Sequence, residues 1–343
     1  MGMTMTSKLL RFALSFVALV FFCGAVVAGG KPDHVTVGYI DLVNPLLIAK
    51  HLKMVEKELG VPVKWVKFDS GVGINSAIAS GSIDFGSVGN PPAAVGVAAG
   101  LPYTGIFILD VLGTVESLAV RADIASSGVK GLAGKRIAVP FGTTSHYELI
   151  NALKRAGISQ GSVKIIDMNP PDILAAWKRG AIDGAYVWQP VLGKIVSSGG
   201  KIIVTSEEMA KAGFPTWDIA VVRKDFAKKY PGIVTRYVKA LSMATDYWQA
   251  HSQTATTLIA DELSVNRSEV AQMMDGTGVV SGKDQLTARY LGTPKSKGRF
   301  VDSLYSTARF LYAQKRLSSI PGKTVFSNFI DPSYLEADVT SAK

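Results

Sequence analysis

The sequence contains an internal repeat, and this feature restricts the possible fold more than any other. The segment from Ile74 to Pro91 matches the segment from Ile173 to Pro190, and each shared position recurs 99 residues later. The shared positions in the first copy are Ile74, Ala77, Gly81, Ile83, Asp84, Val88 and Pro91. Upstream, Val35-x-Val37-x-Tyr39 resembles Ile137-x-Val139-x-Phe141, and Val63-Lys64 matches Val163-Lys164, at spacings of 102 and 100. A repeat of this length predicts two halves with one architecture.

Each half has the pattern of strand, helix, strand, helix and strand. In the first half we expect these elements at 35–40, 45–59, 61–68, 73–79 and 83–88, and in the second at 136–139, 145–156, 163–167, 171–178 and 184–187. Strands that alternate with helices predict an α/β fold in which mostly parallel sheets are flanked by helices. After Val222 the pattern is mostly helical, at 231–249, 252–263, 268–274 and 298–314, and we expect these helices to pack on the first half.

Two similar halves in one chain indicate two lobes around a cleft. Apolar, strand-like segments at Thr114–Val120 and Thr216–Val222 are the expected crossings between the lobes. The first lobe then comprises 31–116 and 219–343, and the second comprises 117–218. A chain of 343 residues with 48% hydrophobic residues can form a core in each lobe.

The first 28 residues have the pattern of a signal peptide. Lys8 and Arg11 precede an apolar stretch from Phe12 to Phe22, and Val26 and Ala28 fit a cleavage site after Ala28. The apolar stretch is too short to span a bilayer. Cys23 is the only cysteine and would leave with the signal, so we expect neither disulfides nor a thiolate metal site. An exported chain without cysteine favours the periplasm.

The net charge of +10 would fall to +8 with the loss of the signal. Basic residues are not interleaved with aromatic residues in a stripe, so we expect no nucleic-acid partner. No phosphate-binding loop, H-E-x-x-H or G-x-S-x-G motif is present, and the four histidines are scattered. We therefore expect no catalytic residues, cofactor or metal. We expect the remaining positive charge to draw anions towards the cleft.

Four turns follow predicted strands at their carboxyl ends, where ligands bind in open α/β sheets. They are Asp69–Gly71, Gly89–Pro91, Gly142–His146 and Trp188–Pro190. The helices that begin there present free N–H groups and partial positive charge, which hold anions. The repeat predicts two such turns on each lobe, facing each other across the cleft.

The third turn has two interpretations. Ser145 and Glu148 have the spacing of a capping box, which would make the turn a plain helix cap. Gly142, Thr143 and Thr144 also supply small, hydroxyl-rich donors around an anion. Its position opposite the Asp69–Gly71 turn favours the anion site.

Glu116 and Asp218 lie in the predicted crossings, next to the floor of the cleft. A buried carboxylate needs a partner, so either one could hold an ammonium group. Alternatively, each is a hinge acid satisfied by backbone N–H groups or a lysine. Trp188 ends a strand at the cleft and either covers a cation or packs in the core. Asp84 and Asp183 recur in the repeat and are expected to brace turns.

Several segments resemble the taurine-binding periplasmic proteins of ABC importers. The resemblance extends from about Val35 to Tyr230, and the run Phe141–Tyr147 is the most specific part. Its other segments are Val66–Gly71, Gly134–Pro140, Asn169–Pro171, Ala175–Trp177, Asp183–Trp188 and Val221–Phe226. The segment after Tyr230 matches less well, so no contacts are carried over from it.

The resemblance implies a type II periplasmic binding fold with two lobes and two hinge crossings. Such a protein captures a small sulfonate and delivers it to a permease in the inner membrane, and we expect it to be a monomer. The implied ligand-binding residues are Asp69, Ser70, Asn90, Glu116, Thr143, Thr144, His146, Trp188 and Asp218. Taurine suits this set, because helix N-termini and hydroxyls fit its sulfonate and Glu116 or Asp218 fits its ammonium group.

Three other functions compete with this one. A protein for alkanesulfonates or another small anion would not need an acid for an ammonium group. Thiamin-pyrimidine synthases are enzymes that resemble this fold, but they are cytosolic and carry a cysteine-rich motif, which is missing here. A sensor domain would need an output module, and none is evident in the sequence.

Overall fold

The structure is a computed structural model that describes residues 30–341. The chain divides into two units, Met1–Gly30 and Lys31–Lys343, and every helix and strand named below belongs to the second unit. The predicted signal peptide and Cys23 lie outside the described residues.

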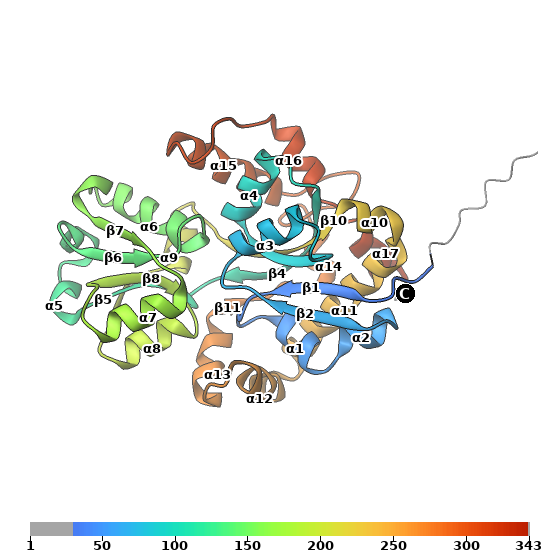
Figure 1. The fold of residues 1–343 in the computed structure, drawn as a ribbon, viewed down its shortest axis with the longest axis horizontal. Helices are drawn as coiled ribbons and strands as arrows, with labels where there is room; N and C mark the ends of the chain where they lie inside the picture. The colour runs from blue at the N-terminus through green and yellow to red at the C-terminus, as the bar shows by residue number, and fades with distance from the viewer. Residues whose placement is uncertain (1–29, 342–343) are drawn as a thin grey trace, which may run out of the picture. The chain divides into compact units, whose positions relative to one another are not determined.

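The larger sheet has six strands in the order β11-β4-β10-β3-β1-β2 (Figure 1). These strands are β1 (Val35–Tyr39), β2 (Val63–Lys67), β3 (Phe85–Gly89), β4 (Tyr103–Leu112), β10 (Trp217–Arg223) and β11 (Thr277–Gly278). The helices that follow its strands in the chain are α1 (Pro45–His51), α2 (Met54–Leu59), α3 (Gly71–Ala79), α4 (Asn90–Ala98) and α10 (Lys224–Lys229). The strands β3 and β4 are almost wholly buried, and their side chains belong to the main hydrophobic core.

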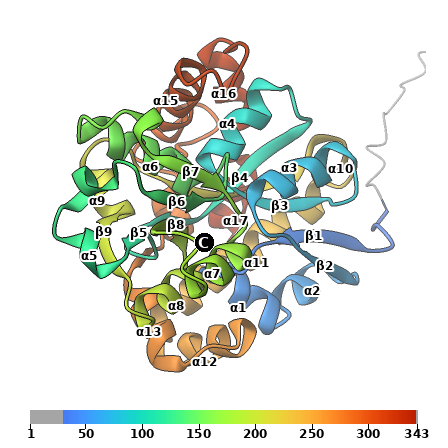
Figure 2. The same cartoon turned by 60° about the vertical axis from the view of Figure 1, so that its left-hand side comes forward.

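The smaller sheet has five strands in the order β7-β6-β8-β5-β9. They are β5 (Glu116–Val120), β6 (Arg136–Val139), β7 (Lys164–Asp167), β8 (Gly184–Trp188) and β9 (Lys201–Thr205). Its α-helices are α5 (Ala122–Ala125), α6 (Thr144–Arg155), α7 (Pro170–Lys178), α8 (Val191–Ser197) and α9 (Ser206–Lys211). Two separate hydrophobic clusters flank this sheet, with α6 on one face and α7 and α8 on the other (Figure 2).

The repeat in the sequence is visible in the strand order. The series β2-β1-β3-β10-β4 corresponds to β7-β6-β8-β5-β9, with parallel pairing among the first three strands of each series. In each series the fourth strand is antiparallel to its neighbours. The expected α/β architecture is confirmed, but the sheets are mixed rather than mostly parallel. The reason is that β4, β5, β9 and β10 lie outside the repeated strand–helix–strand segment.

The repeated aspartates have matching structural roles. The backbone N–H of Thr36 donates to Asp84 at 2.9 Å, and that of Arg136 donates to Asp183 at 2.8 Å. Each aspartate thereby joins the start of its strand to the first strand of its half, a structural role that reaches beyond the turn expected from the sequence.

The chain passes between the sheets twice. It leaves β4 at Leu112 and enters β5 at Glu116, and it leaves α9 at Lys211 and enters β10 at Trp217. The lobe boundaries at 116 and 218 stay a prediction, close to these two connections.

The predicted helix at 45–59 is in fact two helices, α1 and α2. Lys53 between them has a left-handed backbone with φ of 52°, which ends α1 and redirects the chain. Both helices pack against α11 (Pro231–Ala250).

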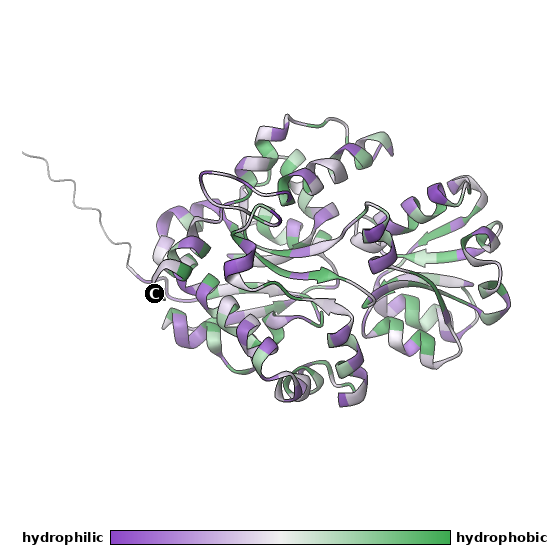
Figure 3. Cartoon of the chain, turned by 180° about the vertical axis from the view of Figure 1, so that it is seen from behind, coloured by the Kyte–Doolittle hydropathy of each residue, from purple (hydrophilic) through white to green (hydrophobic). Residues whose placement is uncertain are grey.

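The part of the chain after β10 is mostly helical, as predicted. It contains α11, α12 (Ser252–Leu263), α13 (Arg267–Asp275), α14 (Gly282–Gln285), α15 (Phe300–Ala313), α16 (Lys323–Phe329) and α17 (Ser333–Ser341). The helix α15 packs on α4, and α17 packs on α11, so these helices cover the larger sheet. Figure 3 shows hydrophobic residues along the strands, and both hydrophobic and hydrophilic residues on the surrounding helices. Within residues 30–341, no helix is both long and apolar enough to cross a membrane.

Candidate functional site

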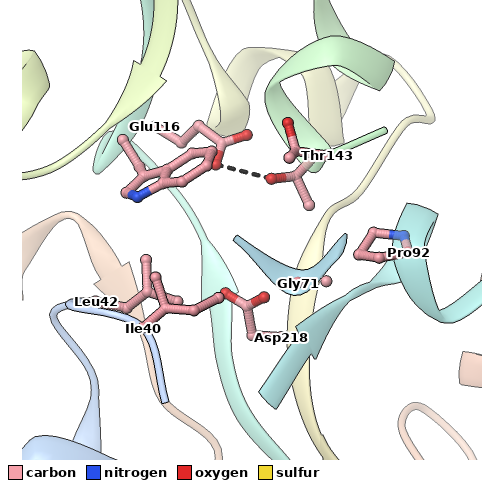
Figure 4. A pocket seen from close by; sticks show the side chains of 10 residues that line it. Ile40, Leu42, Gly71, Pro92, Glu116, Thr143 and Asp218 are labelled. Atoms are coloured by element: carbon pink, nitrogen blue, oxygen red, sulfur yellow. Dashed lines mark hydrogen bonds between the residues drawn. The ribbon is translucent and has the colours of Figure 1, made fainter. Parts of the chain in front are cut away.

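A pocket lies between the carboxyl ends of strands from the two sheets (Figure 4). Its cavity volume is about 30 Å³, so the free space between the lining side chains is small. The residues that line it are Ile40, Leu42, Gly71, Gly89, Pro92, Glu116, Thr143, Thr144, Trp188 and Asp218.

Each of the four turns expected from the sequence contributes to this lining. Gly71 begins α3, Gly89 precedes α4, Thr143 precedes α6, and Trp188 ends β8. The first N–H groups of a helix have no partner within it, so α3 and α6 present free donors to the pocket. Pro92 and its neighbour carry no N–H, so α4 supplies fewer donors. The anion-binding end of the pocket is therefore built mainly by α3 and α6.

The capping box expected at Ser145 is wrong. The residue that caps α6 is Thr143, whose side-chain oxygen accepts from the N–H of His146 at 3.5 Å. Glu148 faces inward instead, because three hydroxyl groups there satisfy its carboxylate. These hydroxyl groups belong to Tyr186, Ser206 and Thr216.

Glu116 is the carboxyl group that the smaller sheet supplies to the pocket. It is buried at the start of β5, and the Thr144 hydroxyl donates to its Oε2 at 2.8 Å. Its other oxygen, Oε1, is buried and accepts no hydrogen bond from any described residue. Burial, and next the nearby charge of Glu148, raise the pKa of Glu116 well above its ordinary value. A cation at Oε1 would satisfy this group.

Asp218 is the corresponding carboxyl group of the larger sheet. In the register of β10 with β3 it lies opposite Gly89, and Glu116 in β5 lies opposite Trp188 of β8. Gly89 and Trp188 are 99 residues apart, which is the spacing of the repeat. The two acids therefore occupy equivalent positions in the two halves and point into one pocket (Figure 4). Burial raises the pKa of Asp218 to about 6.

Asp110 was not singled out from the sequence, although it belongs to this region. It lies opposite Asp218 in the pairing of β4 with β10 and is 2% exposed. The Asn44 amide donates to its Oδ2 at 2.8 Å. The available signal was a single acid within an otherwise uncharged strand, Tyr103–Leu112. Its significance depends on a pairing with residue 218 that periodicity does not reveal.

The structure brings together five of the nine predicted ligand-binding residues, and the other four lie outside this pocket. Asp69 is exposed, and Ser70 precedes α3 without a side-chain hydrogen bond to it. Asn90 is buried and donates to the Thr307 hydroxyl at 3.0 Å, which joins α4 to α15.

His146 lines a neighbouring pocket together with Phe310 and Arg316. Its Nδ1 accepts from the N–H of Gly142 at 3.2 Å, and its ring stacks on Phe141 at 4.4 Å. Burial and the charge of Arg316 lower the pKa of His146 to about 4, so this ring is neutral at pH 7. Its contacts support the turn before α6.

Ile40 and Leu42 line the pocket but were not predicted to do so. They follow β1, and the repeat spacing of 102 aligns Leu42 with Thr144. The repeat could therefore have identified this turn as well. Two aromatic residues near these segments, Tyr39 and Trp217, pack against Trp65 and Phe300.

The pocket has two chemically distinct parts. Helix N-termini and threonine hydroxyls suit an anion, whereas Asp218 and Glu116 suit a cation. Among the described residues that line it, none is a lysine or arginine. The apolar side chains of Ile40, Leu42 and Pro92 and the indole of Trp188 supply the rest of the wall. Fold and site together define the class: a ligand-binding protein with two α/β lobes and a binding pocket between them.

Comparison with known proteins places the chain within this class. It matches the NMT1-like family over residues 28–263. It is similar to the taurine-binding periplasmic protein of Escherichia coli (strain K12), with 35% identity over 303 residues that cover 88% of this chain and 93% of that protein. The chain therefore belongs to the NMT1-like family.

Solved structures show the same fold. The alkanesulfonate-binding protein SsuA from Xanthomonas axonopodis pv. citri, bound to MOPS, has a TM-score of 0.72 at 21% identity and covers 88% of this chain and 99% of that one. The desulfurization enzyme DSZB has a TM-score of 0.67 at 17% identity and covers 91% and 100%. The fold is thus shared by binding proteins and by an enzyme, so the assignment of function depends on the site.

Proposed function

We propose that this chain is a periplasmic solute-binding protein that captures taurine between its lobes and delivers it to an ABC permease. One observation carries the proposal: two buried carboxyl groups, one from each lobe, share a pocket with the N-termini of α3 and α6. Taurine has a sulfonate at one end and an ammonium group at the other, and the pocket offers a matching group to each.

In this proposal the sulfonate accepts hydrogen bonds from the N–H groups at the starts of α3 and α6. The ammonium group donates to Asp218 and to Oε1 of Glu116, which has no hydrogen-bond partner among the described residues. Trp188, Leu42 and Pro92 cover the two methylene groups between these ends. Because the two acids come from different sheets, the ligand binds fully only when both lobes contact it, which couples binding to closure.

The similarity to a protein named as taurine-binding, at 35% identity, supports this ligand over amine-free sulfonates. The same similarity supports a transport role rather than an enzymatic one, with the chain exported by the signal peptide expected at 1–28. We propose that the protein acts as a monomer and needs no cofactor or metal.

Isothermal titration of the mature protein with taurine, ethanesulfonate and nitrate tests the proposal. Taurine is expected to bind at least about tenfold more tightly than ethanesulfonate, because only taurine neutralises the buried acids. Ethanesulfonate binding as tightly as taurine would instead indicate an alkanesulfonate-binding protein. Heat from nitrate alone, or from none of the three, would overturn the assignment.

A further inference from the structure

Asp110 and Asp218 are paired directly across two strands. In antiparallel pairing, opposed side chains lie on the same face with Cβ atoms about 5 Å apart. Both side chains are buried, at 2% and 6% exposure. Two adjacent ionised carboxylates in such a place repel each other and lack solvent, so one of them must hold a proton.

The hydrogen bonds identify the acid that holds it. Asp110 Oδ2 accepts from Asn44 Nδ2 at 2.8 Å, which suits an acceptor oxygen. Asp110 Oδ1 is buried and receives no donor from any residue within the described range. An oxygen without a donor is the one that can carry a proton, and Asp218 is the acid paired with Asp110 across the strands. Burial, and next the charge of Asp218, raise the pKa of Asp110 well above its ordinary value.

We propose that Asp110 is a positioning residue, which holds a proton on Oδ1, donates it in a hydrogen bond to Asp218, and so keeps Asp218 oriented and ionised for the ammonium group of the ligand. Asn44 fixes the other oxygen of Asp110, and Asp110 itself does not line the pocket. The consequence for the ligand rests on the proposed function, whereas the shared proton does not.

The surroundings of the pair contain few other charges. Besides Asp110 on β4 and Asp218 on β10, the titratable group that faces them from the smaller sheet is Glu116 on β5, which is itself near Glu148 on α6. On the remaining side Gly89 of β3 has no side chain, and a Cβ there would lie 3.3 Å from Asp218 Oδ1. Because no side chain within residues 30–341 donates a hydrogen bond to the Asp218 carboxylate, the proton on Asp110 would supply one.

The first experiment measures the taurine dissociation constant from pH 5 to 8.5 for the parent, Asp110→Ala and Asp110→Asn. The parent is expected to lose affinity as the pH falls through about 6, because Asp218 becomes protonated. Asp110→Ala is expected to lose tenfold or more at pH 8, and its acidic loss should begin at higher pH, because Asp218 stays buried without its donor. Asp110→Asn should restore most of the affinity and return the profile towards the parent, since its amide group donates in place of the proton.

Equal losses in the two variants with an unmoved pH profile would overturn the proposal in favour of a merely structural role. A greater loss in Asp110→Asn than in Asp110→Ala would overturn it as well, because Asp110 would then be needed as an anion. Asp261→Asn, at an exposed position of α12, is the matched control and should follow the parent.

A second experiment needs no ligand and separates this proposal from the proposed function. Thermal unfolding of the ligand-free parent should show stability rising as the pH falls from 8 to 5, because the folded pair binds a proton more tightly than the unfolded chain. The rise should be smaller in Asp110→Asn, which lacks the titrating group. An equal rise in stability for the parent and Asp110→Asn would contradict the shared proton. A parent that does not bind taurine would contradict only the proposed ligand.

Discussion

Glu116 and Asp218 show how a repeat produces a binding site at the scale of single residues. Each acid lies near the start of an antiparallel strand, opposite the last residue of the neighbouring strand in the sheet. A side chain there is buried against a sheet but open to the cleft. Desolvation of both acids is costly without a cation, so the ligand-free pocket is prepared for a positive group.

Glu148 is a third buried acid, which lies behind Glu116. Burial raises the pKa of Glu148 to about 7, while three hydroxyl donors limit the rise. Because this pKa is above the ordinary value of 4.5, the folded state holds the proton more tightly than the unfolded state. The stability from this group is therefore fully present below about pH 4.5 and lost as the pH rises through about 7.

The predicted consequence is a pH-dependent loss of stability that Glu148→Gln reduces. At about 1.4 kcal/mol for each pKa unit, the contribution of Glu148 is on the order of 3 kcal/mol or less. Denaturant unfolding of ligand-free protein at pH 5 and pH 8 measures it, and the difference between these pH values should shrink in the variant. An unchanged difference would show that Glu148 does not titrate in this range.

At the scale of elements, the starts of α4 and α6 meet across the two lobes. A Cβ atom added at Gly89 would lie 2.8 Å from Thr144 Cγ2, a distance at which something must shift. Gly89 has φ of −72°, which any residue adopts, so a substitution there strains the contact and not the backbone. The contact between the starts of α4 and α6 thus depends on the absence of a side chain at Gly89.

Gly89→Ala is predicted to weaken taurine and ethanesulfonate binding alike, by about tenfold or more, because it opposes closure and not one end of the ligand. The melting temperature should change little. Gly232→Ala is the control, since a Cβ there meets nothing within 4 Å in α11. Titration calorimetry with both ligands measures the effect, and unchanged affinity for both would contradict the role of this contact.

The helix α6 also shows the limit of local signals. A capping box at Ser145 and Glu148 is a valid spacing, but spacing does not show which face of the helix meets the sheet. Glu148 faces the hydroxyl groups of β8, α9 and the segment before β10, which are 38 to 68 residues away in the chain. Thr143 caps the helix instead. The prediction that this turn lies at the pocket is confirmed, whereas the predicted capping residue is wrong.

At the scale of the whole molecule, the repeat predicted the two α/β halves and the four turns that contribute to the pocket. The strand-like segments that form β5 and β10 were predicted, but their antiparallel direction was not, because it depends on the crossings between the sheets and not on the repeated segment. Asp110 was missed for the same reason, since its partner is 108 residues away. The resemblance implied Asn90 and His146 as ligand-binding residues. In the structure Asn90 joins α4 to α15, and His146 supports the turn before α6.

The central claim is that one pocket binds a sulfonate at helix N-termini and an ammonium group at Asp218. Titration of Asp218→Asn with taurine and ethanesulfonate at pH 8, compared with the parent, tests it most directly. The predicted result is a loss of about 30-fold or more for taurine, the usual scale for breaking a buried charge pair, with ethanesulfonate affinity equal or improved. Equal losses for both ligands, or taurine binding as tight as in the parent, would contradict the claim.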